Sequence, residues 1–422
     1  MADSDLLIIG AGISGLSMAH YAAAAGWSVQ ILEKEHRIGG CLHSHRFTGS
    51  LDGFWLELGA HSAFNSYSHL LAILESLHAL ERLRPRAKVG FRLFADGAVR
   101  RIPTQLSFSE LLLAPFRLLG LIKTGRSVAE YYGHIVGPRN YAAVFGPAFS
   151  AVICQSADEF PADALFNPRP RRKEVPRGFT LPGGVQTLAE IVAGSSGVRV
   201  ALGQTVTDIQ HQGERFVVRT DSGDYTTRAL CLATPVAVTT QLLRPEFPEV
   251  AEPLMEVKTA TVETVGVAIP KSRLTLPLVA GLIGRNEPFL SVVSRDTVPD
   301  PSYRGFTFHF RPGRLDEAGK RDCIARVLGV PGDLPASMNM IEKLNQLPAL
   351  RVGHGERAQA IDGLLAGSRL ALTGNYFTGI AIEDCVARSR QEFARLQHEL
   401  ERICPPCVKG GTQNLRWFKK KA

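Results

Sequence analysis

The order of apolar and polar positions at the start of the chain predicts a strand, a glycine turn, a helix and a second strand. Residues 6–9 are all apolar, which is typical of a strand buried on both faces of a parallel sheet. An alanine-rich stretch over residues 16–25 predicts a helix that ends at Gly26, and residues 29–32, three of them apolar, predict a second strand. This succession indicates an α/β domain built around a parallel sheet.

Three glycines lie between the first strand and the helix in the pattern G-x-G-x-x-G. Gly10 allows a tight turn, Gly12 allows the backbone to approach a pyrophosphate, and Gly15 allows close packing of helix and strand. The backbone N–H groups of Ile13 and Ser14 lie at the helix N-terminus, where phosphate groups bind. The sequence therefore predicts a dinucleotide site at this turn.

The second strand ends in Glu33, which lies 18 residues beyond Gly15. An acidic side chain at this place accepts hydrogen bonds from a ribose 2′-OH, and it argues against the 2′-phosphate of NADP. These residues alone do not separate NAD from FAD.

The continuation of the chain resembles one group of flavoproteins. Residues 33–41 read E-K-E-H-R-I-G-G-C, which is similar to the E-x-x-x-R-x-G-G segment of FAD-dependent amine oxidases, desaturases and protoporphyrinogen oxidases. The resemblance implies that FAD is the cofactor and that Lys34, Arg37, Gly39, Gly40 and Cys41 surround its pyrophosphate and flavin side. A cationic side chain and two glycines suit a diphosphate that the backbone approaches closely. Cysteine here departs from the Arg or Lys that is commoner in these families.

Two further segments carry the same resemblance. Residues 56–61 resemble a segment that lies near the flavin ring, and residues 370–386 most resemble the protoporphyrinogen/coproporphyrinogen oxidase branch of the flavin amine oxidase superfamily. The other residues that the resemblance implies to contact FAD are Gly59, Ala60, His61, Val206, Ala233, Thr234, Gly374, Asn375, Gly379, Ile380, Ala381, Ile382 and Asp384. For His61, a buried structural histidine is an equal alternative to a flavin or substrate contact.

The predicted fold is a discontinuous Rossmann-type FAD-binding domain (GR2-like) with an inserted α+β substrate domain. The FAD-binding domain is assigned to residues 1–80, 178–236 and 353–403, with the antiparallel sheet of the substrate domain over 237–352. Residues 81–177 are expected to form a β-hairpin and a helical lobe.

Within that lobe, residues 106–155 are rich in leucine and phenylalanine, with a break at Pro115 and cations at the margins. This pattern fits either a packed subdomain or an apolar surface at a membrane interface. The candidate substrate residues are Arg169, Arg171, Arg172, Arg177, Tyr376 and Phe377. A solvated basic loop is the alternative for the four arginines.

Composition adds a few limits. Lys and Arg number 48 against 40 Asp and Glu, and the net charge of +8 is spread over 422 residues. This excess favours an anionic substrate or a membrane surface and argues against nucleic acid. Seven scattered cysteines and the lack of an apolar leader favour the cytoplasm, with peripheral contact to the inner face of a membrane left open.

The last residues carry two minor features. Cys404 and Cys407 form a single C-x-x-C with no second pair or nearby histidines, so no metal site is predicted. Residues 404–422 are expected to be a disordered basic tail. The sequence leaves the oligomeric state open.

No Ser/His/Asp or paired-carboxylate arrangement is apparent, which fits an enzyme whose cofactor performs the chemistry. The resemblance implies that hydride passes from a large, carboxylated, porphyrinogen-like ring to FAD, with O2 as the expected acceptor. The alternatives are an amine oxidase or desaturase, a flavin isomerase similar to UDP-galactopyranose mutase, and a flavin-binding scaffold without turnover.

Overall fold

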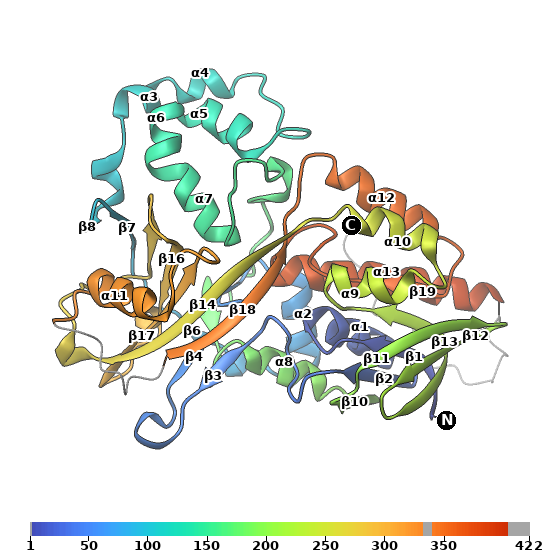
Figure 1. Ribbon diagram of the computed structural model, residues 1–422. Coiled ribbons are helices and arrows are strands. Elements are labelled where there is room, and N and C mark those ends of the chain that lie inside the picture. Colours follow the sequence, from blue (N-terminus) through green and yellow to red (C-terminus); the bar gives the residue numbers. More distant parts are fainter. Residues whose placement is uncertain (1, 332–339, 404–422) are drawn as a thin grey trace.

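Seven strands form the central sheet of the first lobe in the computed structural model, which describes residues 2–331 and 340–403 (Figure 1). Across the sheet the order is β10-β2-β1-β13-β12-β11, and β19 pairs with β13. The strands are β1 (Ala2–Ile9), β2 (Val29–Glu33), β10 (Val198–Leu202), β11 (Val206–Gln212), β12 (Arg215–Thr220), β13 (Gly223–Leu232) and β19 (Leu370–Leu372). Two pairs are antiparallel, β11 with β12 and β12 with β13, and all other neighbouring strands are parallel.

Helices cover both faces of this sheet. One face carries α1 (Ile13–Ala24), α2 (Ser68–Ser76), α8 (Gln186–Ala193) and α13 (Ile382–Ile403). The other carries α9 (Val236–Leu243), α10 (Pro248–Met255) and α12 (His354–Leu365). Along β1, Leu6 and Ile8 pack with the first group, and Leu7 and Ile9 with the second. Burial on both faces is the reason that this strand is uniformly apolar, and the predicted Rossmann-type lobe is confirmed.

The second lobe is built on another seven-stranded sheet, ordered β18-β14-β17-β16-β15-β7-β8. Its strands are β7 (Phe91–Ala95), β8 (Ala98–Arg100), β14 (Thr259–Pro270), β15 (Gly281–Gly284), β16 (Phe289–Ser294), β17 (Tyr303–Phe310) and β18 (Met340–Pro348). Every pair is antiparallel except β15 with β7. Helix α11 (Glu317–Leu328) packs on the apolar face of this sheet.

Short helices form the outer end of the second lobe, at the upper left of Figure 1. They are α3 (Phe108–Leu112), α4 (Ala114–Leu118), η4 (Ala129–Gly133), α5 (His134–Val136), α6 (Pro138–Asn140), η5 (Tyr141–Phe145) and α7 (Gly146–Ile153). The expected break at Pro115 is present, because α4 begins at Ala114 with this proline in its first turn. In the part of the chain that the structure describes, no helix is both long and apolar enough to span a bilayer.

The remaining elements are short. They are the strands β3 (Ser44–Arg46), β4 (Trp55–Glu57), β5 (Ala63–Phe64), β6 (Arg84–Pro85) and β9 (Gly178–Thr180), and the 3-10 turns η1 (Gly49–Leu51), η2 (Leu80–Arg82), η3 (Ile102–Gln105), η6 (Ala162–Ala164), η7 (Lys271–Arg273) and η8 (Arg295–Thr297). Strands β3 and β4 form a hairpin, and β9 lies between β5 and β6.

Within 81–177, the hairpin of β7 and β8 extends the second sheet through β15, and Leu93 and Ala95 of β7 pack with Ala148 and Ala151 of α7. One predicted boundary differs from this packing. Helices α9 and α10 pack against α12 beneath the first sheet, so the second lobe starts after them and not at residue 237. In both cases backbone pairing or apolar burial with distant segments decides the grouping. The residues 404–422, with Cys404 and Cys407, lie outside the described part of the chain.

Candidate functional site

The glycine turn after β1 has room for a side chain at only one of its three glycines. A Cβ at Gly10, where φ is +104°, would lie 2.7 Å from the carbonyl oxygen of Ala233. A Cβ at Gly15 would overlap the carbonyl oxygen of Gly10, whereas one at Gly12 would meet nothing within 4 Å. The protein's own packing therefore requires Gly10 and Gly15, while Gly12 faces open space at the start of α1, where a phosphate can approach.

Glu33 is held beside this turn by two backbone hydrogen bonds. Its Oε2 accepts from the N–H of Ala11 at 2.7 Å, and its Oε1 accepts from the N–H of Glu35 at 2.9 Å. The N–H of Gln204 donates to the carbonyl of Glu33 at 2.8 Å, which brings the start of β11, with Val206, to the same edge of the sheet. Lys34, by contrast, is largely exposed, at 65 % of its side chain.

The loop that follows β2 folds back onto the glycine turn. The N–H of Gly39 donates to the carbonyl of Ala11 at 2.8 Å, and a Cβ at Gly40 would lie 3.2 Å from the Cα of Gly12. Arg37 donates from Nη2 to the carbonyl of Gly40 at 2.9 Å, so it braces this loop. Burial lowers the pKa of the Arg37 guanidinium.

The residues that follow β13 and β4 also lie at this site. The N–H of Ala233 donates to the carbonyl of Ile9 at 2.8 Å, and Thr234 follows it with its Oγ1 2.8 Å from that of Thr239. A Cβ at Gly59 would overlap the carbonyl oxygen of Cys41, which also accepts from the N–H of Ala60 at 2.9 Å. The predicted segments around residues 10, 40, 60 and 233 are therefore brought together.

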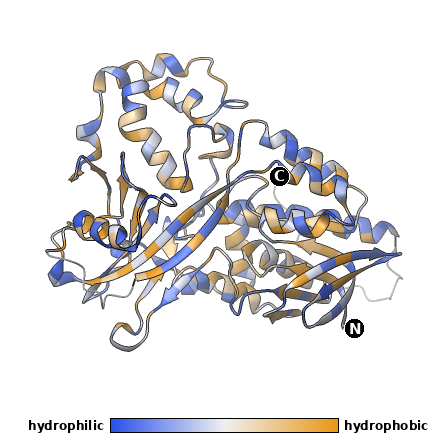
Figure 2. Cartoon of the chain, in the orientation of Figure 1, coloured by the Kyte–Doolittle hydropathy of each residue, from blue (hydrophilic) through white to orange (hydrophobic). Residues whose placement is uncertain are grey.

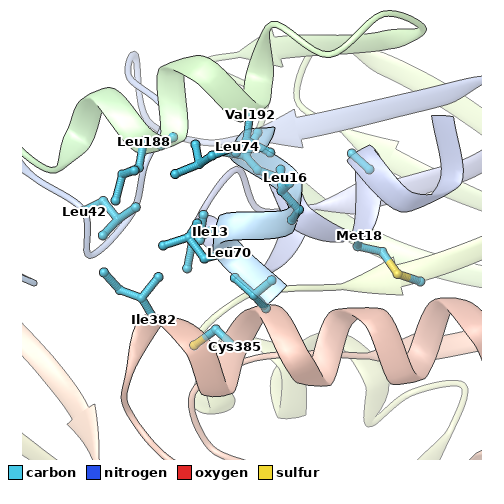
Figure 3. Packing of buried hydrophobic residues seen from close by; sticks show 14 of the residues in the cluster. Ile13, Leu16, Met18, Leu42, Leu70, Leu74, Leu188, Val192, Ile382 and Cys385 are labelled. Carbon is cyan, nitrogen blue, oxygen red and sulfur yellow. The ribbon is translucent and has the colours of Figure 1, made fainter. Parts of the chain in front are cut away.

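Helices α1 and α13 lie side by side. Ser389 Oγ donates to the carbonyl of Ser14 at 2.8 Å, and the rings of Tyr21 and Phe393 stack further along the same two helices. Side chains of both helices share one apolar cluster in Figure 3. No side chain of the described residues caps α1. The two helices run in the same direction, so their positive ends lie toward the same end of the pair, which favours an anionic group there.

The loop before α13 is shaped by Asp384. Asp384 Oδ2 accepts from the N–H of Ala381 at 3.1 Å, and Oδ1 pairs with Arg169. Burial raises the pKa of Asp384, and the nearby Arg169 guanidinium opposes that rise. A Cβ at Gly379 would lie 2.5 Å from this carboxylate, and one at Gly374 would lie 2.6 Å from the ring of Tyr376. Asn375, Ile380 and Ala381 are half-buried, and Ile382 is buried.

His61 faces a histidine from the other lobe. Its ring stacks on that of His309 of β17, with centroids 6.0 Å apart, and its Nδ1 donates to the carbonyl of Gly59 at 3.2 Å. Burial and the charge of Arg86 lower the pKa of His61 to about 4, and burial with the nearby His61 lowers that of His309 to about 3. Both rings are therefore uncharged at neutral pH.

Glu57 lies beside this pair at a small cavity of about 30 Å³, also lined by Arg86 and Arg295. Its carboxylate accepts from Ser44 Oγ at 2.6 Å and from the N–H of Val185 at 2.9 Å. Burial raises the pKa of Glu57 to about 7. The cavity is large enough for about one water molecule.

Several polar residues at this junction were not predicted from the sequence. Asn345 of β18 donates from Nδ2 to the carbonyl of Leu58 at 2.8 Å and to Thr264 Oγ1 at 2.8 Å. Lys343 lies on the same face of β18, and burial followed by the charge of Arg37 lowers its pKa to about 8. For His309, which is 3 % exposed, the signal in the sequence is a polar residue between Phe308 and Phe310, whereas β18 contains four polar residues and gives no such signal.

The predicted substrate residues are not brought together. Arg172 pairs with Glu75 at 2.8 Å and with Glu174 at 2.6 Å, and Arg169 is engaged by Asp384. Arg171 and Arg177 are exposed. The arginine cluster is therefore in part a set of structural ion pairs.

The prediction for Tyr376 and Phe377 is corrected. Each is only 2 % exposed and packs in the apolar cluster between the first sheet and the layer of α9, α10 and α12. The hydroxyl of Tyr376 lies 3.3 Å from Thr239 Oγ1. Core burial therefore occupies both rings, away from the second lobe.

The residues at this site fit FAD. The open space at Gly12, the adjacent helix ends and the braced Gly39–Gly40 loop suit a diphosphate. The buried Nδ1 of His43, two residues beyond Cys41, has no hydrogen-bond partner among the described residues. Such an atom is expected where a ligand supplies the partner. Across residues 2–331 and 340–403, no group of three or more His, Cys, Asp or Glu is placed to hold a metal ion.

This arrangement defines the chain as an FAD-dependent oxidoreductase with a Rossmann-type cofactor lobe. Residues 13–306 match the family described as flavin containing amine oxidoreductase, and the chain belongs to that family. The recognition of this family, the enzyme class and FAD as cofactor are thereby confirmed.

Similarity extends over nearly the whole chain. Protoporphyrinogen oxidase of Bos taurus is 23% identical, with 93% of this chain and 98% of that protein covered. Coproporphyrinogen III oxidase of Propionibacterium freudenreichii subsp. freudenreichii is also 23% identical, with 91% and 89% covered. A crystal structure from Exiguobacterium sp. 255-15, assigned as a protoporphyrinogen oxidase, shares the fold with a TM-score of 0.76 at 19% identity, covering 95% of this chain and 99% of that one.

Proposed function

We propose that this protein oxidises a large carboxylated ring of the porphyrinogen type, with O2 as the electron acceptor. The observation that carries this proposal is that two porphyrinogen oxidases match more than nine-tenths of the chain, including both parts of the second lobe. A match confined to the cofactor lobe would support FAD binding alone. The positive net charge of +8 is in keeping with an anionic substrate.

When bound, FAD supplies a two-electron acceptor for hydride. The residues of the chain hold and orient the cofactor and the substrate. We propose that the N–H groups of Ile13, Ser14 and Gly15 bind the diphosphate and that Glu33 binds a ribose hydroxyl. The positive end of α13, at Ile380 to Ile382, is placed to stabilise negative charge near the flavin ring.

His61 and His309 are proposed to line the substrate side of the flavin. Because both imidazoles are uncharged at neutral pH, neither adds a positive charge beside a substrate that is losing hydride. With Nδ1 of His61 donating to Gly59, its Nε2 keeps a lone pair that can accept a proton. Asn345 joins Leu58 to the second sheet and so keeps the two lobes in register across the site.

The test is anaerobic flavin spectroscopy of the purified holoenzyme with protoporphyrinogen and, separately, coproporphyrinogen. We expect loss of the oxidised-flavin band with at least one of them, and recovery in air with appearance of a fluorescent porphyrin. A band unchanged by both compounds would overturn the porphyrinogen assignment and leave the FAD-dependent enzyme class in place. The family name favours amines as the next substrates to test.

A flavin isomerase would behave differently. Such an enzyme would need reduced flavin before substrate is added and would consume no net O2. Oxygen uptake that is stoichiometric with substrate would exclude it.

A second proposal concerns the outer helices, which we infer to bind an anionic membrane surface. Between residues 108 and 122, seven large apolar side chains are exposed, among them Leu112 at 76 %, Phe116 at 72 % and Leu119 at 78 %. Residues 97–129 contain five cations and a single acidic residue, Glu110. Glu110 points inward, where its carboxylate accepts from the N–H of Asn140 at 3.1 Å. Exposed apolar side chains in a cationic setting are typical of a helix that lies in a lipid interface.

Figure 2 shows apolar and polar residues alternating along these outer helices. Sedimentation with vesicles of phosphatidylcholine and phosphatidylglycerol tests the proposal. We expect binding that weakens strongly in the variant F116S/L119S and in high salt. Equal binding of the wild type and this variant would contradict it.

A further inference from the structure

A cavity of about 730 Å³ separates the outer helices from one end of the second sheet. On the helical side it is lined by Tyr141 and Ser150, and on the sheet side by Asn286, Arg311 and Arg314. Phe149, the neighbour of Ser150 on α7, packs in the apolar cluster against which Ile380 lies. One helix therefore separates this cavity from the loop that precedes α13.

Two arginines at this cavity have no acidic partner. Among residues 2–331 and 340–403, no carboxylate oxygen forms an ion pair with Arg311 or Arg314. Arg311 is half-buried, and burial followed by the charge of Arg314 lowers its pKa. Two neighbouring like charges, one of them partly desolvated, raise the free energy of the protein unless an anion binds between them.

Each of the two carboxylates that line the cavity has a hydrogen-bond or ion-pair partner other than these arginines. Asp158 accepts from the hydroxyl of Tyr141 at 2.8 Å. Glu287 pairs with Arg326 at 3.1 Å. The arginines thus lie in a cavity whose acidic side chains already have other partners.

The turn that carries the two arginines is anchored. The N–H of Arg311 donates to the carbonyl of Pro288 at 2.9 Å, which continues the pairing of β17 with β16. The N–H of Gly313 donates to Glu263 Oε1 at 2.9 Å, and the same carboxylate pairs with Lys320 at 2.9 Å. A turn held at both positions limits the loss of conformational entropy when a ligand binds.

We propose that Arg311 and Arg314 bind a carboxylate of the substrate at this cavity. The guanidinium groups suit this role because each offers two parallel N–H donors that match the two oxygens of a carboxylate. The identification of the ligand as the substrate rests on the proposed function above. Arg169 and Arg172, which the sequence had suggested for this role, are held by Asp384, Glu75 and Glu174.

The test compares holoenzyme variants R311Q, R314Q and the double variant with R244Q. Arg244 is exposed and lies at the end of α9 in the other lobe, so R244Q removes the same charge far from the cavity. The probes are coproporphyrin III, which carries four carboxylates and has no hydride to give, and its tetramethyl ester. Binding is followed by quenching of flavin and tryptophan fluorescence.

We expect the Kd for coproporphyrin III to rise about tenfold for each single variant, since a charge-assisted hydrogen bond contributes about this factor. The ester should bind wild type and variants alike, and R244Q should bind coproporphyrin III as the wild type does. Equal Kd values for coproporphyrin III in the double variant and in R244Q would overturn the proposal. If the double variant fails to fold, the Kd of R314Q for coproporphyrin III decides. This single variant is expected to fold because Arg314 is exposed.

A failure of the porphyrinogen assignment is distinguishable from a failure of this site. If wild type does not bind coproporphyrin III, calorimetry with citrate, a tricarboxylate, replaces it. Citrate binding that is lost in the double variant and kept in R244Q would support the carboxylate site while the porphyrin is abandoned. Citrate binding that is absent, or the same in all variants, would overturn it.

Discussion

The two lobes differ in how their functional residues come together. In the cofactor lobe, contacts such as the one between Glu33 and Ala11, or Gly39 and Ala11, join residues that lie within about one βα unit. At the junction with the second lobe, His61 meets His309 and Leu58 meets Asn345, across more than half of the chain. A cofactor site whose contacts are local can be recognised as a sequence motif. A substrate site whose contacts join distant segments forms only after the strands have paired.

The lobes also differ in how they use apolar residues. Leu6, Leu7 and Ile8 of β1 are completely buried, so each contributes about 1.5–3 kcal/mol from removal of its side chain from water. Leu112 and Leu119 in the outer helices keep more than three quarters of their surface exposed. The same residue type is therefore a source of stability in one lobe and a surface for contact in the other.

The largest expected effect tests the difference in burial between the leucines of the two lobes. Leu7→Ala should lower the free energy of unfolding by about 4 kcal/mol because it leaves a cavity between β1 and the layer of α9, α10 and α12. Leu112→Ala, the same change at an exposed position, should cost no more than about 0.5 kcal/mol. Urea denaturation of both variants measures the difference, and similar costs would contradict the assignment of Leu112 to the surface.

A somewhat smaller effect separates the two roles of glycine in the cofactor lobe. Gly15→Ala should destabilise the protein by about 3 kcal/mol, because its Cβ would overlap the carbonyl of Gly10. Gly12→Ala should leave the stability of the FAD-free protein within about 0.5 kcal/mol of wild type, since its Cβ meets open space. Its effect should appear as about a tenfold rise in the Kd for FAD, measured by flavin fluorescence. Tight FAD binding by Gly12→Ala would refute the phosphate role of this position.

Glu57 at the junction of the lobes predicts a pH dependence. The pKa of Glu57 is raised to about 7 in the folded protein, so ionisation disfavours the folded state and stability is lost as pH rises from the unfolded pKa through 7. Relative to Glu57→Gln, which does not ionise, wild type should lose about 2 kcal/mol between pH 5 and pH 8. Denaturation of both proteins at the two pH values checks this. If the difference in unfolding free energy between wild type and Glu57→Gln does not vary with pH, the pKa of Glu57 is not raised in the folded protein.

The smallest expected effect concerns the ion pair of Arg169 and Asp384. Arg169→Gln should lower stability by about 1 kcal/mol at pH 7, because it leaves a largely buried carboxylate, 16 % exposed, without its partner. The exposed Arg177 provides the matched control, and Arg177→Gln should be neutral. Thermal denaturation of both variants at pH 7 measures the difference in stability. Equal behaviour of the two variants would assign Arg169 to the solvated loop.

Much of the cofactor lobe could be predicted from sequence. The strand ending in Glu33 was predicted at its observed bounds, and α1 begins three residues before the expected Leu16 because the glycine motif itself includes the first helical turn. The packing of α1 against α13 was not predicted. Tyr376 was misassigned because an aromatic residue in a glycine-bearing loop gives no sign of the face on which it is buried.

The second lobe was predicted in outline and missed in detail. An antiparallel sheet was expected over 237–352, but the pairing of β7 with β15 joins residues about 190 positions apart and leaves no local signal. For the same reason Arg311 was not singled out, although Arg169 was. Charge density along the chain finds arginine clusters, but it does not show which of them have acidic partners in space.

The sequence by itself determined the dinucleotide turn, the acidic end of β2 and the burial of β1 on both faces, because these follow from steric limits at glycine and from the apolar pattern of neighbouring residues. Only the tertiary structure decided which charges are neutralised and which aromatic rings are in the core. It also decided that His61 and Asn345 lie between the lobes and that the cavity at Arg311 lies within the second lobe. Those properties depend on distances between segments that strand pairing and burial bring together, and such distances are not encoded at any single stretch of the chain.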